Sequence, residues 1–291
     1  MPHGLDHIVH TVRDLDAAGE FYRRLGFIVS ARNRHSWGTH NRIVQLANGF
    51  VEILEVAEPD KVVPHAARAF SFGAFHRDYA TSRQGLSMLI LSSRNAVEDA
   101  RAFQTAGISE FEVFNFAREG KKPDGTPVKL AFSLVFACEP GSPDLSFALC
   151  QHHFPENFWD PAFQIHGNGA RKVSGVVMVA DNPTDHHVFL KAFIGTRDLH
   201  ASSIGVKADV GNGDVDIMEP VAFRDQFGVL PEVGGAGMTL NAIRFQMADV
   251  DATEATLRSG GLTAQRHAGR LVLAPDFALG ATLIFENAKR G

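Results

Sequence analysis

The chain has 291 residues, of which 45% are hydrophobic and 21% are charged, a composition typical of a globular protein with an apolar core. Its formal net charge is −5, and no basic stripe or block of like charges occurs, which argues against nucleic acid as a partner. The sequence contains neither an apolar leader nor an apolar run of roughly 18 residues, so we expect no signal peptide and no membrane partner.

The first 56 residues predict a strand, a helix and three further strands, in that order. The first strand begins with Gly4-Leu-Asp-His-Ile-Val-His10, and the helix ends at Leu25-Gly26. Asp14 or Asp16 stands where a side chain can cap the first turn of the helix, and glycine readily adopts the left-handed conformation that ends one. The three later strands are expected at residues 28–33, 41–46 and 50–56. This order defines a βαβββ module.

The same pattern recurs three more times, with drift. The second copy begins at Gly85, the third at Val173 and the fourth at Leu240. Each copy has Asp or Asn before its helix and Gly after it. The strands that follow each helix are expected at 108–116, 130–137 and 145–152 in the second copy, 200–207, 210–213 and 214–219 in the third, and 263–267, 270–274 and 281–286 in the fourth.

One such module cannot close a core alone, but two modules can do so around a shared concave face. We therefore predict an α+β fold, in which four βαβββ modules pair into two cupped, barrel-like mixed sheets with helices outside. The predicted domains are residues 1–150 and 171–291. The connector, residues 151–170, is rich in Phe and His, and we expect it to cover a cavity mouth or fill the seam between the domains.

Two polar residues interrupt the apolar strands of the first module: His7 in its first strand and Glu52 in its last. Burying either group costs several kcal/mol unless a partner satisfies it. A metal ion would satisfy both, and so would hydrogen bonds between them. The 23 phenylalanines indicate either a large core or an apolar ligand cavity.

The first module resembles the vicinal oxygen chelate superfamily, in its glyoxalase-like branch. The resemblance rests on the Asp14-Leu-Asp16 turn, on Leu25-Gly26-Phe27, and on the segments Leu5-Asp-His-Ile8, Gly38-Thr-His-Asn41 and Gly49-Phe-Val-Glu-Ile-Leu54. Members of that superfamily pair βαβββ modules into a cup that holds one divalent metal, which a substrate chelates through two oxygens. The resemblance therefore implies a small-molecule substrate and a metal site on the concave face.

Residue by residue, the resemblance implies that His7 and Glu52 are metal ligands. Met88 stands where the partner module would supply another ligand, and a thioether is a poor ligand for a hard divalent ion. In the last strand of the second module, alternation places His152 toward the cup if the small residues of that strand face inward, whereas the other register offers Gln151. His7, Glu52 and His152 would suit Fe(II), Mn(II), Zn or Ni.

We expect a metal-dependent lyase, isomerase or dioxygenase-type enzyme, with Glu52 or His40 moving a proton. The alternative is a protein of the same fold that binds a small molecule without chemistry. His40 could equally be an exposed turn residue. In the second half only Asp216 could bind a metal, so that half is expected to be structural or to form a homodimer. Two cysteines, Cys138 and Cys150, fit a reducing, cytoplasmic location.

Overall fold

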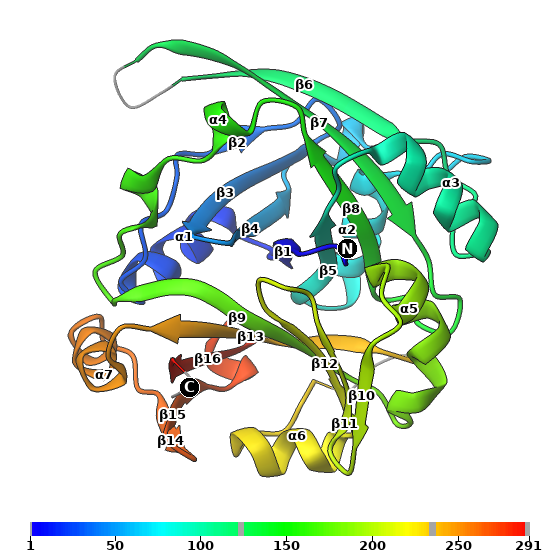
Figure 1. The fold of residues 1–291 in the computed structure, drawn as a ribbon. Coiled ribbons are helices and arrows are strands. Elements are labelled where there is room, and N and C mark those ends of the chain that lie inside the picture. Colours follow the sequence, from blue (N-terminus) through cyan, green and yellow to red (C-terminus); the bar gives the residue numbers. More distant parts are fainter. Residues whose placement is uncertain (1, 122–124, 233–236, 289–291) are drawn as a thin grey trace.

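The computed structural model describes residues 2–121, 125–232 and 237–288. Within these residues the chain forms two mixed sheets of eight strands each (Figure 1). The strand order is β2-β3-β4-β1-β5-β8-β7-β6 in the first sheet and β10-β11-β12-β9-β13-β16-β15-β14 in the second. The two orders are equivalent, because each sheet joins two βαβββ modules through their first strands. The predicted fold of four modules in two cupped sheets is confirmed.

The first sheet is built by the first two modules. Its strands are β1 (Leu5–Thr11), β2 (Asn33–Arg34), β3 (Thr39–Leu46), β4 (Gly49–Val56), β5 (Gly85–Ser92), β6 (Phe114–Lys121), β7 (Pro127–Ala137) and β8 (Ser146–His152). The first strands of the two modules, β1 and β5, pair antiparallel at the centre. Each pairs in parallel with the last strand of its own module, β4 or β8.

The second sheet repeats this arrangement, but its strands equivalent to β3, β4, β6 and β7 are shorter. Its strands are β9 (Ala170–Val179), β10 (Leu199–Ser202), β11 (Gly205–Asp209), β12 (Asp214–Met218), β13 (Thr239–Met247), β14 (Gln265–His267), β15 (Arg270–Leu273) and β16 (Thr282–Asn287). Again the central pair, β9 and β13, is antiparallel.

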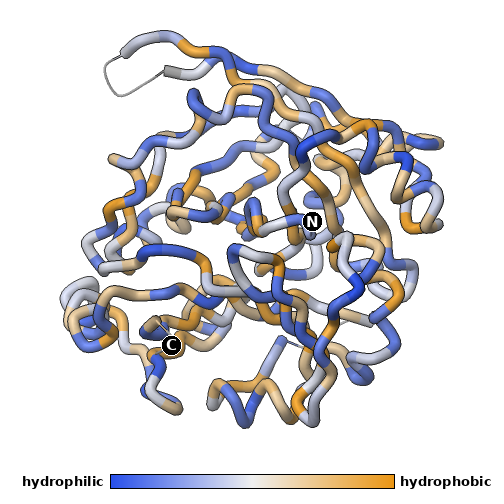
Figure 2. The backbone as a smooth tube through the Cα atoms, in the orientation of Figure 1, coloured by the Kyte–Doolittle hydropathy of each residue, from blue (hydrophilic) through white to orange (hydrophobic). Residues whose placement is uncertain are grey.

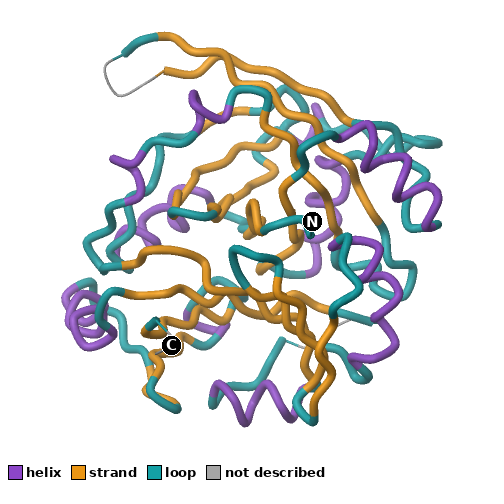
Figure 3. Tube along the Cα trace, in the orientation of Figure 1, coloured by secondary structure: helices purple, strands orange, loops and turns teal. Residues whose placement is uncertain are grey.

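The helices lie around the sheets (Figure 3). Those of the four modules are α1 (Leu15–Arg24), α3 (Ala96–Ala106), α5 (His187–Ile194) and α7 (Val250–Ser259). Two further helices, which the repeat pattern does not predict, join modules within a sheet: α2 (Phe72–Ser82) and α6 (Pro220–Phe227). Their Phe72 and Phe223 pack with residues of the cupped faces, so these two helices lie on the inner side of the sheets. The short α4 (Pro155–Phe158) belongs to the connector.

The outer faces of both sheets and the four module helices share one hydrophobic cluster, which runs from Leu5 to Phe285. Apolar segments follow the interior strands of both halves, and polar ones are frequent in the peripheral turns (Figure 2). Each concave face has a smaller cluster of its own. The two sheets use residues 5–152 and 170–287, and a common core joins them.

Four strand predictions were wrong. The single strand expected at 200–207 is a hairpin of β10 and β11, with a turn at residues 203 and 204. Residues 28–33 are mostly without regular structure, and the short β2 begins only at Asn33. The strand expected at 108–116 begins six residues later, as β6 at Phe114. Residues 210–213 form a turn that joins β11 to β12. The sequence of residues 120–125, which contains Pro-Asp-Gly, also predicts a turn between the strands expected at 108–116 and 130–137; its residues 122–124 lie outside the described part. No helix among the described residues is long and apolar enough to cross a membrane.

Candidate metal centre and ligand cavity

His7 and Glu52 meet on the concave face of the first sheet. Successive side chains of a strand point to opposite faces, so His7 shares the cup face with Val9, next to Phe50 and Glu52 of β4. The His7 ring stacks on the Phe50 ring with centroids 4.3 Å apart. His7 Nε2 lies 3.8 Å from Glu52 Oε2, and both residues are buried. The two residues that are out of place in apolar strands therefore adjoin in space.

Asp6, the residue before His7, also reaches this site. The β1–β5 pairing shifts register between Leu5 and His7, and the Asp6 carboxylate approaches His7 Nδ1 at 2.6 Å. A carboxylate accepts, so His7 Nδ1 donates and the lone pair of the neutral ring is on Nε2, facing Glu52. Burial alone would raise the pKa of Asp6, but His152 and His7 lower it well below its ordinary value. Asp6 thus orients His7 as a carboxylate orients a metal-binding histidine.

His152 lies on the cup side of β8, where alternation placed it. Its neighbour Gln151 turns to the helix side and accepts a hydrogen bond from the Ala96 amide at the start of α3. His152 Nε2 lies 3.1 Å from Asp6 Oδ2, so this nitrogen donates to Asp6. The other ring nitrogen, Nδ1, is buried and has no hydrogen-bond partner among the described residues. Asp6 therefore bridges the two imidazoles, and sequence reasoning did not single it out.

The three predicted ligands do not form one compact group. Among the described residues, the group of three or more His, Cys, Asp and Glu side chains whose ligand atoms all lie within 4.8 Å of one another is Asp6, Cys150 and His152. Burial raises the pKa of the Cys150 thiol well above its ordinary value, with further increases from the nearby carboxylates. His152 thus adjoins Asp6 and Cys150, whereas His7 and Glu52 form the neighbouring pair.

Glu52 is held by the strand beside it. Asn41 Nδ2 donates to Glu52 Oε1 at 2.6 Å, and Asn33 Nδ2 donates in turn to Asn41 Oδ1 at 2.9 Å. This fixes one carboxylate oxygen and leaves Oε2 facing His7. Burial raises the pKa of Glu52, although His7, Asn41 and Arg118 each act in the opposite direction. Glu52 is therefore easier to protonate than an exposed glutamate.

His40 is neither the cavity-lining proton carrier nor the exposed turn residue that the sequence left open, because it is buried within β3 and lines neither cavity described below. It alternates with Asn41 along β3, so it faces the other side of the sheet, where its neighbour Arg42 pairs with Asp16 of α1. His40 Nε2 contacts Glu58 at 2.8 Å, and its Nδ1 accepts from Arg32. Besides His7, the inner cavity is lined by His35, whose ring stacks on Trp37.

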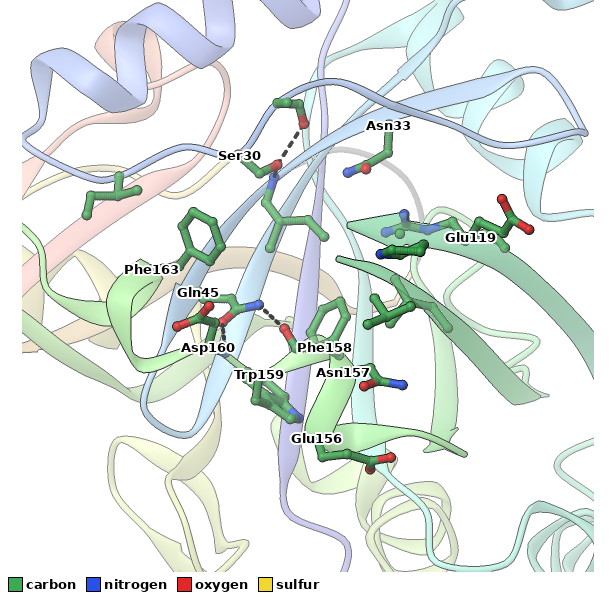
Figure 4. Close-up of a pocket in the computed structure, with 18 of the residues that line it drawn as sticks. Ser30, Asn33, Gln45, Glu119, Glu156, Asn157, Phe158, Trp159, Asp160 and Phe163 are labelled. Carbon is green, nitrogen blue, oxygen red and sulfur yellow. Dashed lines mark hydrogen bonds between the residues drawn. The ribbon is translucent and has the colours of Figure 1, made fainter. Parts of the chain in front are cut away.

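Two adjoining cavities open beside these groups. The inner one, about 50 Å³, is lined by His7, Asn41 and Glu52 and by a largely aromatic wall. The outer one, about 680 Å³, lies between β3, the β6–β7 hairpin and the connector (Figure 4). Both have Ile43, Arg118 and Phe158 in their walls. Residues 156–160 and Phe163 of the connector line the outer cavity, which is one of the two positions expected for this segment.

The connector is held in place by Gln45, which points into the outer cavity (Figure 4). Gln45 Nε2 donates to the Phe158 carbonyl at 2.7 Å, and Gln45 Oε1 accepts from the Asp160 amide at 3.2 Å. These bonds position Phe158 and Trp159 against the cup, where the Trp159 ring stacks on His152. The connector thereby closes one side of the site.

The second sheet has a buried ion-pair cluster at the equivalent position. Asp216 pairs with Val177 as Glu52 pairs with Val9, so the two carboxylates correspond. Arg244 Nη1 donates to Asp216 Oδ2 at 2.6 Å, and its Nε donates to Glu286 Oε1 at 3.0 Å. A guanidinium thus satisfies the carboxylates where the first sheet has His7.

The donor set of the first sheet fits a divalent ion. Two bonds of about 2.1 Å would span the 3.8 Å between His7 Nε2 and Glu52 Oε2. The His7 lone pair already faces that space. His152 has a lone pair at Nδ1 that meets no hydrogen-bond partner among the described residues, beside this pair in the group with Asp6 and Cys150. A nitrogen-and-carboxylate set of this kind suits Fe, Mn, Zn or Ni.

Comparisons with known proteins agree with this architecture. The family model described as "Glyoxalase-like domain" matches residues 5–194, more than half of the chain. Among curated protein sequences, none is similar enough to count as a match.

Solved structures of low sequence identity share the fold. A hypothetical protein from Staphylococcus aureus has a TM-score of 0.68 at 13% identity, with 98% of this chain and 99% of that chain covered. A mutant of 4-hydroxymandelate synthase from Streptomyces coelicolor has a TM-score of 0.58 at 13% identity, with 100% and 94% covered. The Mn(II)-bound glyoxalase from Novosphingobium aromaticivorans has a TM-score of 0.54 at 12% identity, with 98% and 82% covered. The chain belongs to the glyoxalase-like domain family of the vicinal oxygen chelate superfamily.

Proposed function

We propose that the chain is a metal-dependent enzyme of the glyoxalase or dioxygenase kind, acting on a small substrate with chelating oxygens. One observation carries the proposal: His7 Nε2 and Glu52 Oε2 face each other at 3.8 Å, buried at the end of a cavity with largely apolar walls. Two structural neighbours, a Mn(II)-bound glyoxalase and a mutant of 4-hydroxymandelate synthase, support it.

In this proposal His7, Glu52 and His152 hold the ion, which acts when bound as a Lewis acid toward a substrate oxygen. Asp6 accepts from His7 Nδ1 and so keeps Nε2 available. Glu52 would also move a proton of the substrate, as a carboxylate held at the reacting centre can. Phe50, Phe132 and other apolar wall residues exclude water from these atoms.

Metal analysis tests the proposal. Protein reconstituted separately with Fe(II), Mn(II), Zn(II) or Ni(II) should retain one ion per chain after gel filtration, and elemental analysis measures it. His7→Ala and Glu52→Gln should each lose that ion, because each removes one atom of the facing pair. His200→Ala, at an exposed histidine of the second sheet, is the matched control and should retain it. Absence of bound metal in the reconstituted wild-type protein would refute the enzyme proposal.

The third ligand can be tested separately, since Cys150 adjoins His152 and Asp6. Cobalt(II) bound to a thiolate gives a near-ultraviolet charge-transfer band that nitrogen and oxygen ligands do not give. We expect no such band, and an unchanged metal content in Cys150→Ser. A strong band that disappears in Cys150→Ser, together with metal retention by His7→Ala, would move the site to Asp6, Cys150 and His152.

A second candidate function is the binding of a small molecule without chemistry. It is favoured by Met88, which is buried on the cup face where the partner module would otherwise supply a ligand. Thermal-shift measurements distinguish the two functions. Stabilisation by apolar ligands but by none of the four metals would favour the binding protein, and stabilisation by a metal would favour the enzyme.

A further inference from the structure

Arg118 is a cation on the inner face of an otherwise aromatic strand. Along β6, the side chains of Phe114, Phe116 and Arg118 alternate with exposed residues, so all three turn toward the cup. Across the hairpin, Phe116 pairs with Phe132 and Arg118 pairs with Leu130. Phe132 and Leu130 are both buried. Arg118 therefore occupies a position at which the inward-facing phenylalanines of β6 predict another apolar side chain.

The guanidinium has no carboxylate partner within the described part of the chain. None of the ion pairs or hydrogen bonds among the described residues involves Arg118. Glu52 acts on it only at longer range, and Glu119, its neighbour in sequence, is exposed on the other face of the strand. Burial lowers the pKa of Arg118, but an arginine remains charged at neutral pH. A partly buried charge without a partner is costly, and an anion in the cavity would offset that cost.

Arg118 stands where the two cavities adjoin. It lines both the inner cavity, which contains His7 and Glu52, and the outer cavity of about 680 Å³. That volume is typical of sites for small organic molecules. The outer cavity also presents Ile43, Phe158 and Phe163, so it suits an apolar body of aromatic size.

The carboxylates at the outer cavity do not neutralise Arg118. Glu119 and Glu156 are exposed, and Asp160 Oδ1 accepts from the Ala162 amide within its own turn. A planar guanidinium binds a carboxylate through two parallel hydrogen bonds, a geometry that amides and alcohols do not match.

We infer that these cavities bind a small organic acid with an aromatic or similarly apolar body, and that Arg118 binds its carboxylate. The head group then lies beside His7 and Glu52, while the body extends into the outer cavity. The inference deepens the proposed function by naming a substrate class. The binding of the anion itself does not require the metal, so the two proposals can fail separately.

The chain has its own reporters for this test. Its two tryptophans are Trp37, which lines the inner cavity, and Trp159, which lines the outer one. Phenylacetate, 3-phenylpropionate and 4-phenylbutyrate are titrated against the full-length protein, alongside their uncharged primary amides. Tryptophan fluorescence gives the dissociation constants, before and after dialysis against a chelator.

At least one acid of the series should bind about tenfold or more tightly than its amide, with or without the chelator, because a charged hydrogen-bonded pair is lost in the amide. Arg118→Gln should remove the preference and Arg118→Lys should retain part of it. Arg94→Gln, at an exposed arginine before α3, should leave it unchanged. The acid–amide comparison in the wild-type protein needs no variant to fold.

Equal affinities for acid and amide throughout the series, or no binding of any acid, would overturn the inference, and so would a preference that persists in Arg118→Gln. His7→Ala separates this inference from the proposed function. If that variant loses metal but still prefers the acids, both proposals stand. If the wild-type protein binds no metal but prefers the acids, only the enzyme proposal fails.

Discussion

At the scale of single residues, Asp6 is the side chain on which the site depends. It is buried, and it contacts both His7 Nδ1 and His152 Nε2, so one carboxylate sets the tautomer of two imidazoles. In a regular strand Asp6 and His7 would point to opposite faces, so strand alternation alone does not predict that Asp6 reaches the site. The register shift between Leu5 and His7 brings the two side chains together.

We expect Asp6→Asn to weaken metal binding by about 10- to 100-fold without abolishing it, since a residue that orients a ligand contributes that much. Competition with a chromogenic chelator measures the affinity. Asp60→Asn, at an exposed aspartate, is the control and should bind as the wild type does. Complete loss of metal, as in His7→Ala, would show instead that Asp6 is a ligand, and unchanged affinity would remove it from the site.

His10 gives the fold a pH dependence. Its Nε2 lies 2.9 Å from the Leu279 carbonyl and must donate, so the neutral ring accepts from the Tyr22 hydroxyl at Nδ1. Burial lowers the pKa of His10 to about 4, partly offset by the bond to Leu279. In the unfolded chain histidine titrates near 6.5, so between these values the unfolded state binds more protons. Stability is therefore complete above this window and is lost as the pH falls through it.

Urea unfolding between pH 4.5 and 7.5 tests this expectation. Each such histidine should add about 1.4 kcal/mol per pH unit to the slope of the unfolding free energy. His35 and His76 act in the same direction, because burial lowers the pKa of each to about 3. His10→Asn should reduce the slope by the contribution of one proton, whereas the exposed His200→Asn should leave it unchanged. An unaltered slope in His10→Asn would show that His10 does not titrate in this way.

At the scale of elements, α2 and α6 explain why the two cups differ. They stand at equivalent places, each leading from the end of one module to the next in the same sheet. In the second sheet Phe223 and Phe227 of α6 are fully buried against the concave face, together with Val177, Ala242 and Ile284. In the first sheet α2 leaves room for the cavity beside His7 and Glu52. Because α6 fills the second cup and α2 leaves part of the first cup open, the cavity beside a buried carboxylate lies in the first sheet.

Truncating Phe223, which fills the second cup, should destabilise the fold. We expect Phe223→Ala to lower the free energy of unfolding by about 3–5 kcal/mol, as is usual when a buried phenylalanine is replaced. Val221→Ala on the same helix is the control, since Val221 is 56% exposed, and it should change stability by less than about 0.5 kcal/mol. Urea unfolding measures both. Similar effects of the two substitutions would show that α6 does not fill the cup.

At the scale of the whole molecule, the two halves share one fold but satisfy their buried carboxylates differently. In the first half the site has histidines and an open cavity. In the second, Arg244 binds Asp216 and Glu286, and Arg270 also donates to Glu286 at 2.9 Å. The common hydrophobic cluster joins the halves, so a loss of stability in one should be felt in the other.

Arg244→Met should lower the free energy of unfolding by about 3–5 kcal/mol, because it leaves buried carboxylates without their partner. Trp37 lies in the first half and Trp159 lies in the connector, packed against His152 of the first sheet, so their fluorescence reports that half, while circular dichroism reports the whole chain. If the shared core makes folding cooperative, the two signals should shift together in urea. Arg258→Met, at an exposed arginine of α7, is the control. A shift in circular dichroism alone would mean that the halves unfold independently.

By itself, the sequence determined the four modules, because capping residues, closing glycines and apolar strands are local signals that recur in each copy. Asp14, Asn95 and Asp249 cap their helices as those signals predict. The sequence also indicated that His7 and Glu52 need a partner, because a polar residue within an apolar strand is costly to bury. The alternation in β8 correctly assigned His152 to the cup face.

Only the tertiary structure decided which of these groups meet. The approach of Asp6 to two histidines depends on a register shift between strands, and the inward position of Arg118 depends on where β6 begins. Whether a cup stays open depends on how a helix such as α6 packs. These features arise from contacts between residues far apart in the chain, and the local patterns of apolar and polar residues carry no information about such contacts.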